Sequence, residues 1–220
     1  SAHMLSAMLP NCDFKIQQDD LKAKHFAVIE TALLDNLDNK IGQSFEKCLN
    51  LLSKYGMKIT RIKTSVVKDA LALSAQVFSP EAYGTWKDVI EKGPSKMHPP
   101  ILERFRSGQK ISGPDYVKAW QSLENLKIKY LELTDQFNAI LAPTTPILPP
   151  KIDHLLSDDQ YFSERNLLAL RNTRIANLMG VPALTLPSCS NYCGLMIVGK
   201  PFQEEALLNI GKTVERIIKN

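Results

Sequence analysis

Two serine–lysine pairs have a spacing that could support nucleophilic catalysis: Ser44 with Lys47, and Ser65 with Lys68. On a helix, residues three apart share a face, where a neutral lysine could accept the proton of a nucleophilic serine. The Ser-x-x-Lys pattern is short and common by chance, and the S-D-N and K-T-G companions of penicillin-recognising enzymes are absent from the sequence. We expect Ser44 and Lys47 on the solvent side of their helix, and we assign neither pair a catalytic role.

The cysteines and histidines are too scattered to indicate a metal site. Of four cysteines only Cys189 and Cys193 are close together, and no second pair or nearby histidine completes a zinc set. The histidines outside the first few residues are isolated, and no phosphate-binding, dinucleotide-binding or G-x-S-x-G motif occurs. We therefore predict reduced thiols, no metal, no cofactor and no complete active site. The remaining members of these two sets are Cys12, Cys48, His25, His98 and His154.

Composition and charge exclude several classes of protein. The 220 residues are 44% hydrophobic and carry a net charge of only +4, with Lys and Arg spread along the chain. A nucleic-acid-binding or membrane-binding arm would show a block of like charges, and a membrane span needs about 20 apolar residues in a row. We therefore expect a cytoplasmic protein that has neither nucleic acid nor membrane as a partner.

The first regular elements form a strand–helix–strand pattern. Residues 26–34 are an apolar run suited to a buried strand, and residues 58–64 alternate and are rich in β-branched side chains. Between them we expect a helix that Asp38 caps at its start and Gly56 at its end. Strands joined in this way run parallel in one sheet. The apolar stripe of the helix consists of Ile41, Phe45, Cys48 and Leu52.

The stretch from about 65 to 138 is predicted to be mostly helical. Ser79-Pro80-Glu81 has the signature of a helix start, with a capping serine and a proline at the first helical position. Residues 93–100 break the pattern. Ser112 to Asp115 then has capping-box spacing and opens a long helix. We expect one face of that helix to carry Val117, Trp120, Leu123 and Lys127.

The last third returns to alternating strands and helices. We expect a helix over 163–179 that ends at Gly180, and a final amphipathic helix. The whole pattern predicts an α/β fold with at least five strands. The expected strands are 139–143, 182–187 and 194–198, and the final helix has the stripe Leu207, Ile210, Val214 and Ile217.

Six short motifs in order resemble those of the amidase-signature family. The longest, Asn177 to Pro187, follows the pattern Asn-Leu-x-Gly-hydrophobic-Pro-Ala-hydrophobic-x-hydrophobic-Pro. Each motif is weak alone, but the ordered set over about residues 26–218 is specific. The other five are Pro80 to Tyr83, Arg106 to Tyr116, Ile140 to Pro146, Gly194 to Gly199 and Glu204 to Glu215.

The resemblance implies the C-terminal portion of the amidase-signature fold, a mixed sheet flanked by helices with a helical insertion at about 65–138. We expect residues 1–4 to be a tag remnant, 5–24 an irregular lead-in and 25–220 this C-terminal part. Family members hydrolyse or transfer from amides with two serines and a lysine that lie upstream of the matched region. No Gly-Gly-Ser-Ser-Gly-Gly segment occurs here, so we name no catalytic residue and expect this chain alone to be inactive.

The resemblance also gives candidate substrate-binding residues. Thr144 and Thr145 follow the expected strand 139–143, at the end where open α/β sheets place ligand loops. Thr173 and Asn177 lie one turn apart on the helix that leads to the implied wall of the acyl pocket. The alternative for all four is structural, because the threonines could only shape a proline-rich loop and the asparagine could only bind nearby backbone.

The branch of the family is less clearly indicated. In the glutamine-using subunit of tRNA-dependent amidotransferases, an Asp and an Arg hold the two charged ends of glutamine. The matching positions here are Leu170 and Leu123, which cannot bind a zwitterion. Tyr192 also departs from the family, which often has proline there.

Three hypotheses remain from the sequence. The first is a C-terminal fragment of an amide hydrolase, separated by design, proteolysis or gene decay, whose partner is the N-terminal half or a complementing chain. A small amide would then bind only in the complete protein. The second is a non-catalytic subunit or degenerate homologue that acts as a binding protein, and the third is a part of the glutamine-using subunit of an amidotransferase. An uncovered half-sheet also predicts self-association or marginal stability.

Overall fold

The computed structural model describes residues 2–8 and 16–219. The helices are α1 (Ala2–Met8), α2 (Asn39–Tyr55), α3 (Val66–Lys92), α4 (Pro99–Arg106), α5 (Gly113–Thr134), α6 (Ile152–Ser157), α7 (Asp159–Ala169), α8 (Arg174–Met179) and α9 (Glu204–Lys219), with short 3₁₀ turns η1 (Pro94–Lys96) and η2 (Ser107–Lys110). The strands are β1 (His25–Ile29), β2 (Lys58–Ile62), β3 (Ala139–Pro143), β4 (Ala183–Pro187) and β5 (Gly194–Val198).

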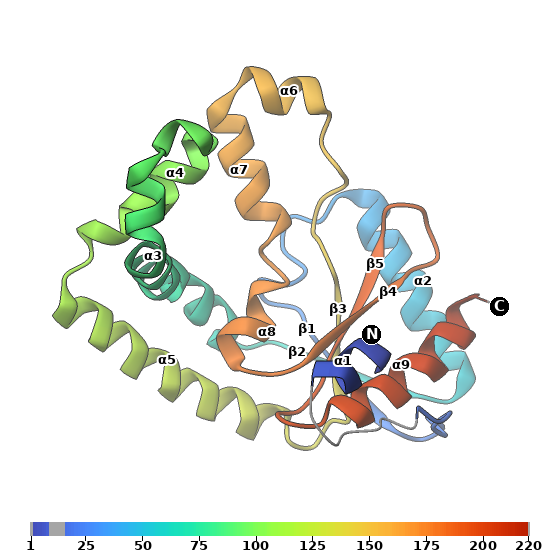
Figure 1. Ribbon diagram of the computed structural model, residues 1–220. Coiled ribbons are helices and arrows are strands. Elements are labelled where there is room, and N and C mark those ends of the chain that lie inside the picture. The colour runs from blue at the N-terminus through green and yellow to red at the C-terminus, as the bar shows by residue number, and fades with distance from the viewer. Residues whose placement is uncertain (1, 9–15, 220) are drawn as a thin grey trace.

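The five strands form one mixed sheet in the order β2-β1-β3-β5-β4 (Figure 1). β1 pairs in parallel with both β2 and β3, whereas β5 runs antiparallel to β3 and β4. The α/β class, the five strands and the parallel β1–α2–β2 unit are therefore confirmed. All five strands lie at the places in the sequence where we expected them.

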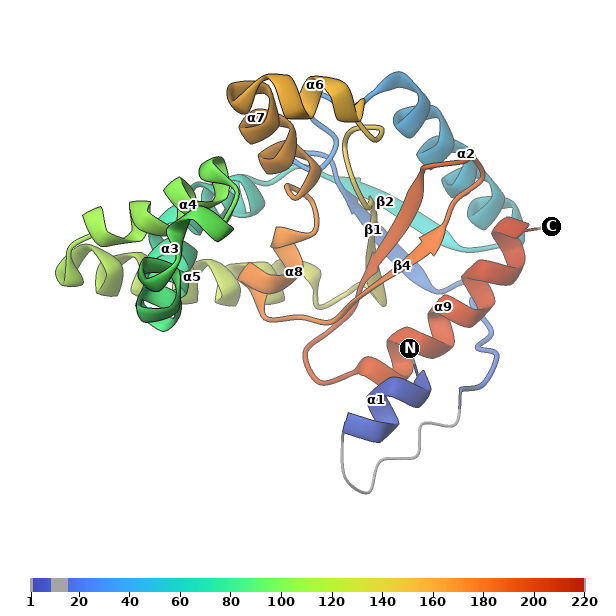
Figure 2. The same ribbon diagram turned by 45° about the horizontal axis from the view of Figure 1, so that its top comes forward.

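Both faces of the central strands are buried, each under its own set of helices. Alternate residues of β1, β3 and β5 pack on one face against α3, α5 and α8, and the others pack on the second face against α2 and α9. Figure 2 shows these two sets on opposite sides of the strands. Burial on both sides explains why these strands are continuous apolar runs without polar alternation.

The helix between β1 and β2 begins differently from our expectation. Gly56 ends α2 in the left-handed conformation, with φ of 109°, as predicted for a C-cap. Asp38 does stand before the first turn, but its side chain makes no capping bond. Its carboxylate instead accepts a hydrogen bond from the backbone N–H of Leu148, at 2.7 Å. The aspartate thus connects the loop before α2 to the loop after β3.

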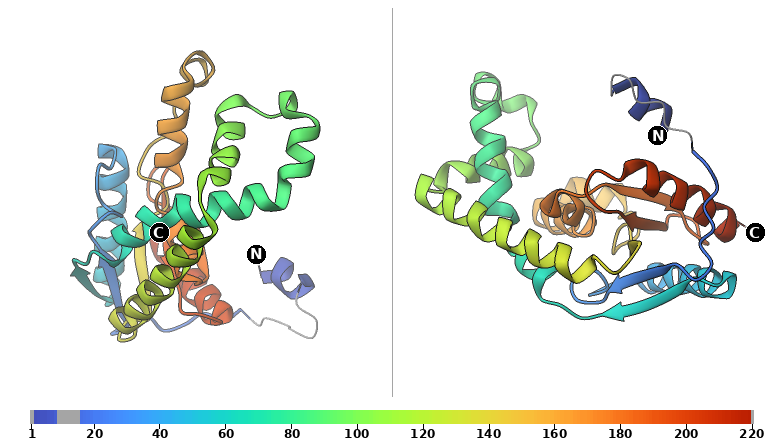
Figure 3. Two further views of the ribbon diagram at one scale, coloured as in Figure 1. Left: turned by 90° about the vertical axis from the view of Figure 1, so that its left-hand side faces the viewer. Right: turned by 90° about the horizontal axis from the view of Figure 1, so that it is seen from below.

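The helix start predicted at Ser79-Pro80-Glu81 is wrong, because α3 continues through Pro80 from Val66 to Lys92. A proline inside a helix removes one backbone hydrogen bond and bends the helix. Figure 3 shows α3 changing direction part-way along its length. Gly108 of η2 packs directly on this bend, since a Cβ there would lie 2.1 Å from the carbonyl oxygen of Ser79. The sequence Ser79-Pro80-Glu81, which we interpreted as a helix start, is therefore a bend within one helix, held by packing against Gly108.

The long helix α5 begins as predicted but buries a different face. Ser112 accepts a hydrogen bond from the N–H of Asp115, which confirms the predicted helix start. Its hydroxyl donates to the Asp115 carboxylate at 2.6 Å, where a full capping box would have the backbone N–H of Ser112 as the donor. Leu123 is buried, but Val117 is exposed, so the expected stripe is only partly right. The buried stripe of the helix consists of Ala119, Leu123, Tyr130 and Thr134.

The stripe predicted for the last helix, α9, is buried as expected, except that Ile218 is buried more deeply than Ile217.

The helix predicted over 163–179 is interrupted between α7 and α8. The side-chain amide of Asn172 donates to the carbonyl oxygens of Leu33 and Pro143, at 3.0 and 2.8 Å. It is fully buried, so these bonds fix the chain between the two helices against the segments that end β1 and β3. Gly180 then ends α8 in the left-handed conformation, with φ of 66°, as predicted.

The N-terminal stretch and the segment between β2 and β3 were also subjects of prediction. α1 is helical within the stretch for which we expected a tag remnant and an irregular lead-in, while residues 9–15 of that stretch, including Cys12, lie outside the described residues. From Val66 to Thr134 the chain is helical, with turns, over the range of the expected insertion. No helix in the described part of the chain is long and apolar enough to cross a membrane.

Replacing Gly108 by alanine should strongly destabilise the protein. The new Cβ would meet the backbone of Ser79 and Pro80, neither of which can rotate away, so we expect a loss of about 2–3 kcal/mol in the free energy of unfolding. Gly84→Ala is the matched control. It lies inside α3 with nothing within 4 Å of its added Cβ, and it should stabilise by about 0.5–1 kcal/mol. Urea unfolding followed by circular dichroism measures both, and equal effects would contradict the close contact at Gly108.

Replacing Asn172 by alanine should remove the side-chain donor of the buried Pro143 carbonyl and leave the Leu33 carbonyl with only the longer bond from Arg171, at 3.4 Å. We expect a loss of about 2–4 kcal/mol in the free energy of unfolding, because a buried acceptor that loses its donor bears a desolvation cost. Asn177→Ala, at an exposed position one turn further along, should change stability by less than about 0.5 kcal/mol. The same denaturation experiment tests this, and a loss of stability at Asn177 as large as that at Asn172 would show that the two bonds do not anchor the segment.

Candidate functional site

The carboxyl ends of β1, β3 and β4 meet at one edge of the sheet. The loops that follow β1 and β3 are joined by backbone, since the N–H of Asp38 donates to the carbonyl oxygen of Pro146 at 2.9 Å. The N–H of Thr144 donates to the carbonyl of Gly194, also at 2.9 Å, which extends the pairing of β3 with β5 by one residue. In open α/β sheets this edge is where ligands bind.

Thr144 contacts a second threonine across the intervening strand β5. Its hydroxyl donates to the hydroxyl of Thr185 in β4, at 3.3 Å. Gly194 lies between them, and a Cβ there would come within 2.6 Å of Oγ1 of Thr144 and 3.2 Å of Cγ2 of Thr185. A glycine at the start of β5 therefore allows the two threonines to meet over it.

One face of β4 is uncovered among the described residues. Ala183, Thr185 and Pro187 are exposed, and we call these three residues the open face. The alternate residues Leu184 and Leu186 pack under α9 on the other side of the sheet. Val198 and Met196, the β5 partners of Ala183 and Thr185, are buried on this side, so coverage of the sheet stops at β4. An edge strand with one bare face is a place where a further segment or ligand can pack.

The other three predicted site residues have unequal surroundings. The hydroxyl of Thr145 donates to the carbonyl of Ile147 at 3.2 Å, within its own loop. The hydroxyl of Thr173 donates to the carbonyl of Leu170 at 3.2 Å. Asn177 is exposed on α8, and its side-chain amide makes no hydrogen bond within residues 2–8 and 16–219. Of these three residues Asn177 thus offers a free polar group, while Thr145 and Thr173 bind local backbone.

Three residues beside these were not predicted. Asn172 anchors the segment, and the side chains of Arg171 and Arg174 are half-buried on either side of it. Burial lowers the pKa of both guanidinium groups, while the charge of Asp35 opposes this for Arg171. Arg174 donates to the carbonyl oxygen of Leu167 at 2.6 Å, so its charge lies at the C-terminal end of α7, where a cation is favoured. The run of two arginines and an asparagine in residues 171–174 could have indicated these roles, but hydrophobic periodicity does not detect such polar residues.

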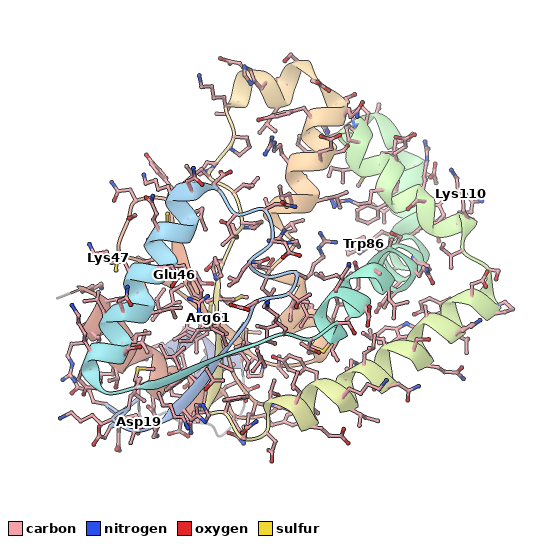
Figure 4. All side chains as sticks on the ribbon, turned by 180° about the vertical axis from the view of Figure 1, so that it is seen from behind. Asp19, Glu46, Lys47, Arg61, Trp86 and Lys110 are labelled. Atoms are coloured by element: carbon pink, nitrogen blue, oxygen red, sulfur yellow. The ribbon has the colours of Figure 1, made fainter. Side chains whose placement is uncertain are left out.

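The Ser-x-x-Lys pairs are not arranged for catalysis. Ser44 is 2% exposed, contrary to our expectation, and its hydroxyl lies 2.8 Å from that of Ser188. Lys47 points into solvent on the outer side of α2 (Figure 4). Beside it, Glu46 accepts two hydrogen bonds of 2.6 Å from Arg61 of β2, which is a structural ion pair. Ser65 and Lys68 are both exposed at the start of α3.

The histidines and the surface hollows suggest no other centre. Nε2 of His25 lies 2.8 Å from the hydroxyl of Thr60, and the His98 and His154 rings each pack against one aromatic ring. No group of three side chains suited to a metal ion occurs among the described residues. Shallow surface hollows lie on the outer sides of α5 and α2, between α3 and α5, and between α4 and α7. None of these hollows is lined by the four predicted site residues.

Two positions that departed from the family pattern have clear surroundings. Leu123 is 1% exposed in the core between α5 and the sheet, whereas Leu170 is 42% exposed at the end of α7. Tyr192 is 75% exposed in the turn between β4 and β5 and has φ of 66°. Proline is fixed near −65°, so the backbone of this turn excludes the proline that the family often has here.

Comparison with known proteins assigns the family. The Amidase family model matches residues 7–208. The chain is 24% identical over 190 residues to 2-amino-5-chloromuconic acid deaminase of Comamonas testosteroni, covering 84% of this chain and 41% of that protein. It is 27% identical over 228 residues to the A subunit of glutamyl-tRNA(Gln) amidotransferase of Sulfolobus acidocaldarius, covering 91% and 47%. The chain thus spans about half the length of these relatives.

A solved structure supports the same fold. The allophanate hydrolase of Kluyveromyces lactis superposes with a TM-score of 0.76 at 18% identity, over 92% of this chain and 34% of that one. At this identity the likeness concerns the fold alone. Because the family model extends over most of the sequence, from before β1 into α9, this chain belongs to the Amidase family.

Proposed function

We propose that residues 25–220 are the C-terminal part of an amide C–N hydrolase, with a helical insertion at about 65–138. In this proposal the chain supplies half of the sheet, a helical cap and one wall of the acyl pocket. The two catalytic serines and the lysine belong to another segment, either of the same polypeptide or of a complementing chain. The chain alone is then inactive.

The observation that carries the proposal is the open face of β4 beside the polar groups at the strand ends. Thr144 directly follows β3 and meets Thr185 of β4, and the carboxyl ends of these two strands share one edge. Asn177 presents an amide that no described residue binds. A side-chain amide that is free in this way can bind the carbonyl or N–H of an amide substrate. Thr145 and Thr173 have weaker support as substrate ligands, because each is bound to its own backbone.

A second candidate is a part of the glutamine-using subunit of an amidotransferase, favoured by the likeness to the Sulfolobus acidocaldarius protein. Against it, neither leucine at the matching positions can pair with a charged end of glutamine. Leu123 is in addition enclosed in the core, where a charged residue would lack a partner. These surroundings favour a less polar substrate.

Amide hydrolysis should require more than this chain. We expect no ammonia release from aryl and aliphatic primary amides by residues 1–220 alone. We expect release once the segment that carries the two serines and the lysine is present, in the same polypeptide or as a complementing chain. In the active form, Asn177→Ala should lower kcat/KM about tenfold, the effect of losing one substrate hydrogen bond of about 1–1.5 kcal/mol. Asn191→Ala, an exposed asparagine in the turn after β4, should leave kcat/KM unchanged.

Each part of this test can fail separately. Hydrolysis by the isolated chain would show that it holds its own catalytic groups. An active enzyme in which Asn177→Ala and Asn191→Ala behave alike would remove Asn177 from the pocket wall while leaving the amidase assignment intact.

The open face also predicts how the isolated chain behaves in solution. β4 pairs only with β5 among the described strands, and its free edge adjoins the open face, so we expect concentration-dependent self-association in sedimentation velocity. Ala183→Lys places a charge on this face and should shift the population toward monomer. Lys58→Ala, on the opposite edge strand, is the control and should not. A monomeric, cooperatively melting sample at all concentrations would contradict the prediction.

A further inference from the structure

Two thiols meet between α2 and the turn that joins β4 to β5. The Sγ atoms of Cys48 and Cys189 lie 3.3 Å apart. Cys48 is buried in the middle of α2, whereas Cys189 is half-buried in the turn. A disulfide bond is about 2.05 Å long, so the two sulfurs would need to approach by only about 1 Å to form one.

Further contacts hold the turn in register along α2. The hydroxyl of Ser44 lies 2.8 Å from that of Ser188, and Sγ of Cys193 lies 3.9 Å from the carbonyl oxygen of Lys40. Lys40, Ser44 and Cys48 are spaced by four residues, so they form one line along the helix. Residues 188–193 form neither helix nor strand, so these contacts with α2 are what align Cys189 with Cys48.

The two thiols differ in reactivity. Burial, together with a hydrogen bond to Cys189, raises the pKa of Cys48 to about 12, so at neutral pH this thiol is protonated and a poor nucleophile. The packing around it also shields it from solvent. Cys189 is partly accessible and is therefore the thiol that a small oxidant meets first. A pair in which one accessible thiol lies next to one buried thiol suits a stepwise exchange.

We propose that Cys48 and Cys189 are a reversible disulfide site that closes in the presence of a small-molecule disulfide. The Cys189 thiolate attacks one sulfur of the reagent, forms a mixed disulfide and releases one thiolate. Cys48 then attacks Sγ of Cys189, and its proton passes to the departing thiolate, which leaves as the second thiol. The two cysteines lose two electrons, and the reagent gains them as it becomes two thiols.

Closure would attach α2 covalently to the turn after β4. That strand carries Thr185, so the crosslink would restrain the edge of the sheet at the open face. In a reducing compartment excess thiol reverses the exchange, so the bond would form only under oxidising conditions. The site is separate from amide chemistry, and its test does not depend on it.

The test is oxidation of the folded chain by glutathione disulfide, followed by alkylation, intact-mass measurement and peptide mapping. We expect two fewer alkyl groups than on the reduced and alkylated chain, no added glutathione, a crosslinked peptide that joins Cys48 to Cys189, and reversal by dithiothreitol. The disulfide would close a loop between residues 141 positions apart in the sequence, which restricts the unfolded chain. We therefore expect a melting temperature roughly 5 °C or more above that of the reduced chain.

Variants separate this site from general thiol oxidation. Cys189→Ser should abolish the crosslink and, because the position is only half-buried, should keep the fold, which circular dichroism checks. Cys193→Ser, in the same turn, should retain the crosslink. Glutathione left on Cys189 without closure, a crosslink through any other cysteine, or an unmodified chain under conditions that oxidise exposed thiols would each overturn the proposal.

Discussion

The arrangement of the last third of the chain depends on the side chain of Asn172. Its amide reaches the carbonyl oxygens of Leu33 and Pro143, which lie in the segments that end two neighbouring parallel strands. Backbone carbonyls at the edge of a sheet lie where its ladder of hydrogen bonds stops, and burying them without a donor would be costly. One amide satisfies both, and in doing so it fixes where α7 must stop and α8 must begin.

The open face is a consequence of this constraint. Because the chain is attached at Asn172, α8 lies across the sheet with Ile175, Ala176, Leu178 and Met179 turned into the core. Asn177 is left on the outside, and the chain enters β4 through the left-handed turn at Gly180. The helices therefore cover β1, β3 and β5 on this side and leave β4 bare.

Sequence patterns predicted the elements whose signals are local. Gly56 and Gly180 end helices, Ser112 caps one, and the apolar runs form strands because each of these effects acts within a few residues. The wrong predictions concern residues whose conformation or hydrogen bonding depends on a partner far away in the sequence. Asp38 gives its carboxylate to Leu148 instead of its own helix, and Pro80 stays inside α3 because Gly108 packs on the bend. Neither partner is visible to a window of local sequence.

In the candidate site, too, some features follow from local sequence and others depend on distant parts of the chain. The motif resemblance selected Thr144 and Asn177 among its four candidates, but the partner of Thr144 depends on the register of three strands and on a glycine in the middle one. With β5 between them, Thr144 and Thr185 are 41 residues apart in sequence and yet share a hydrogen bond. Gly194 matters for that reason, since any side chain there would separate the two hydroxyls. The glycine that opens the family's Gly-Leu-x-hydrophobic-hydrophobic-Gly motif is thus explained here by the space that two threonines need.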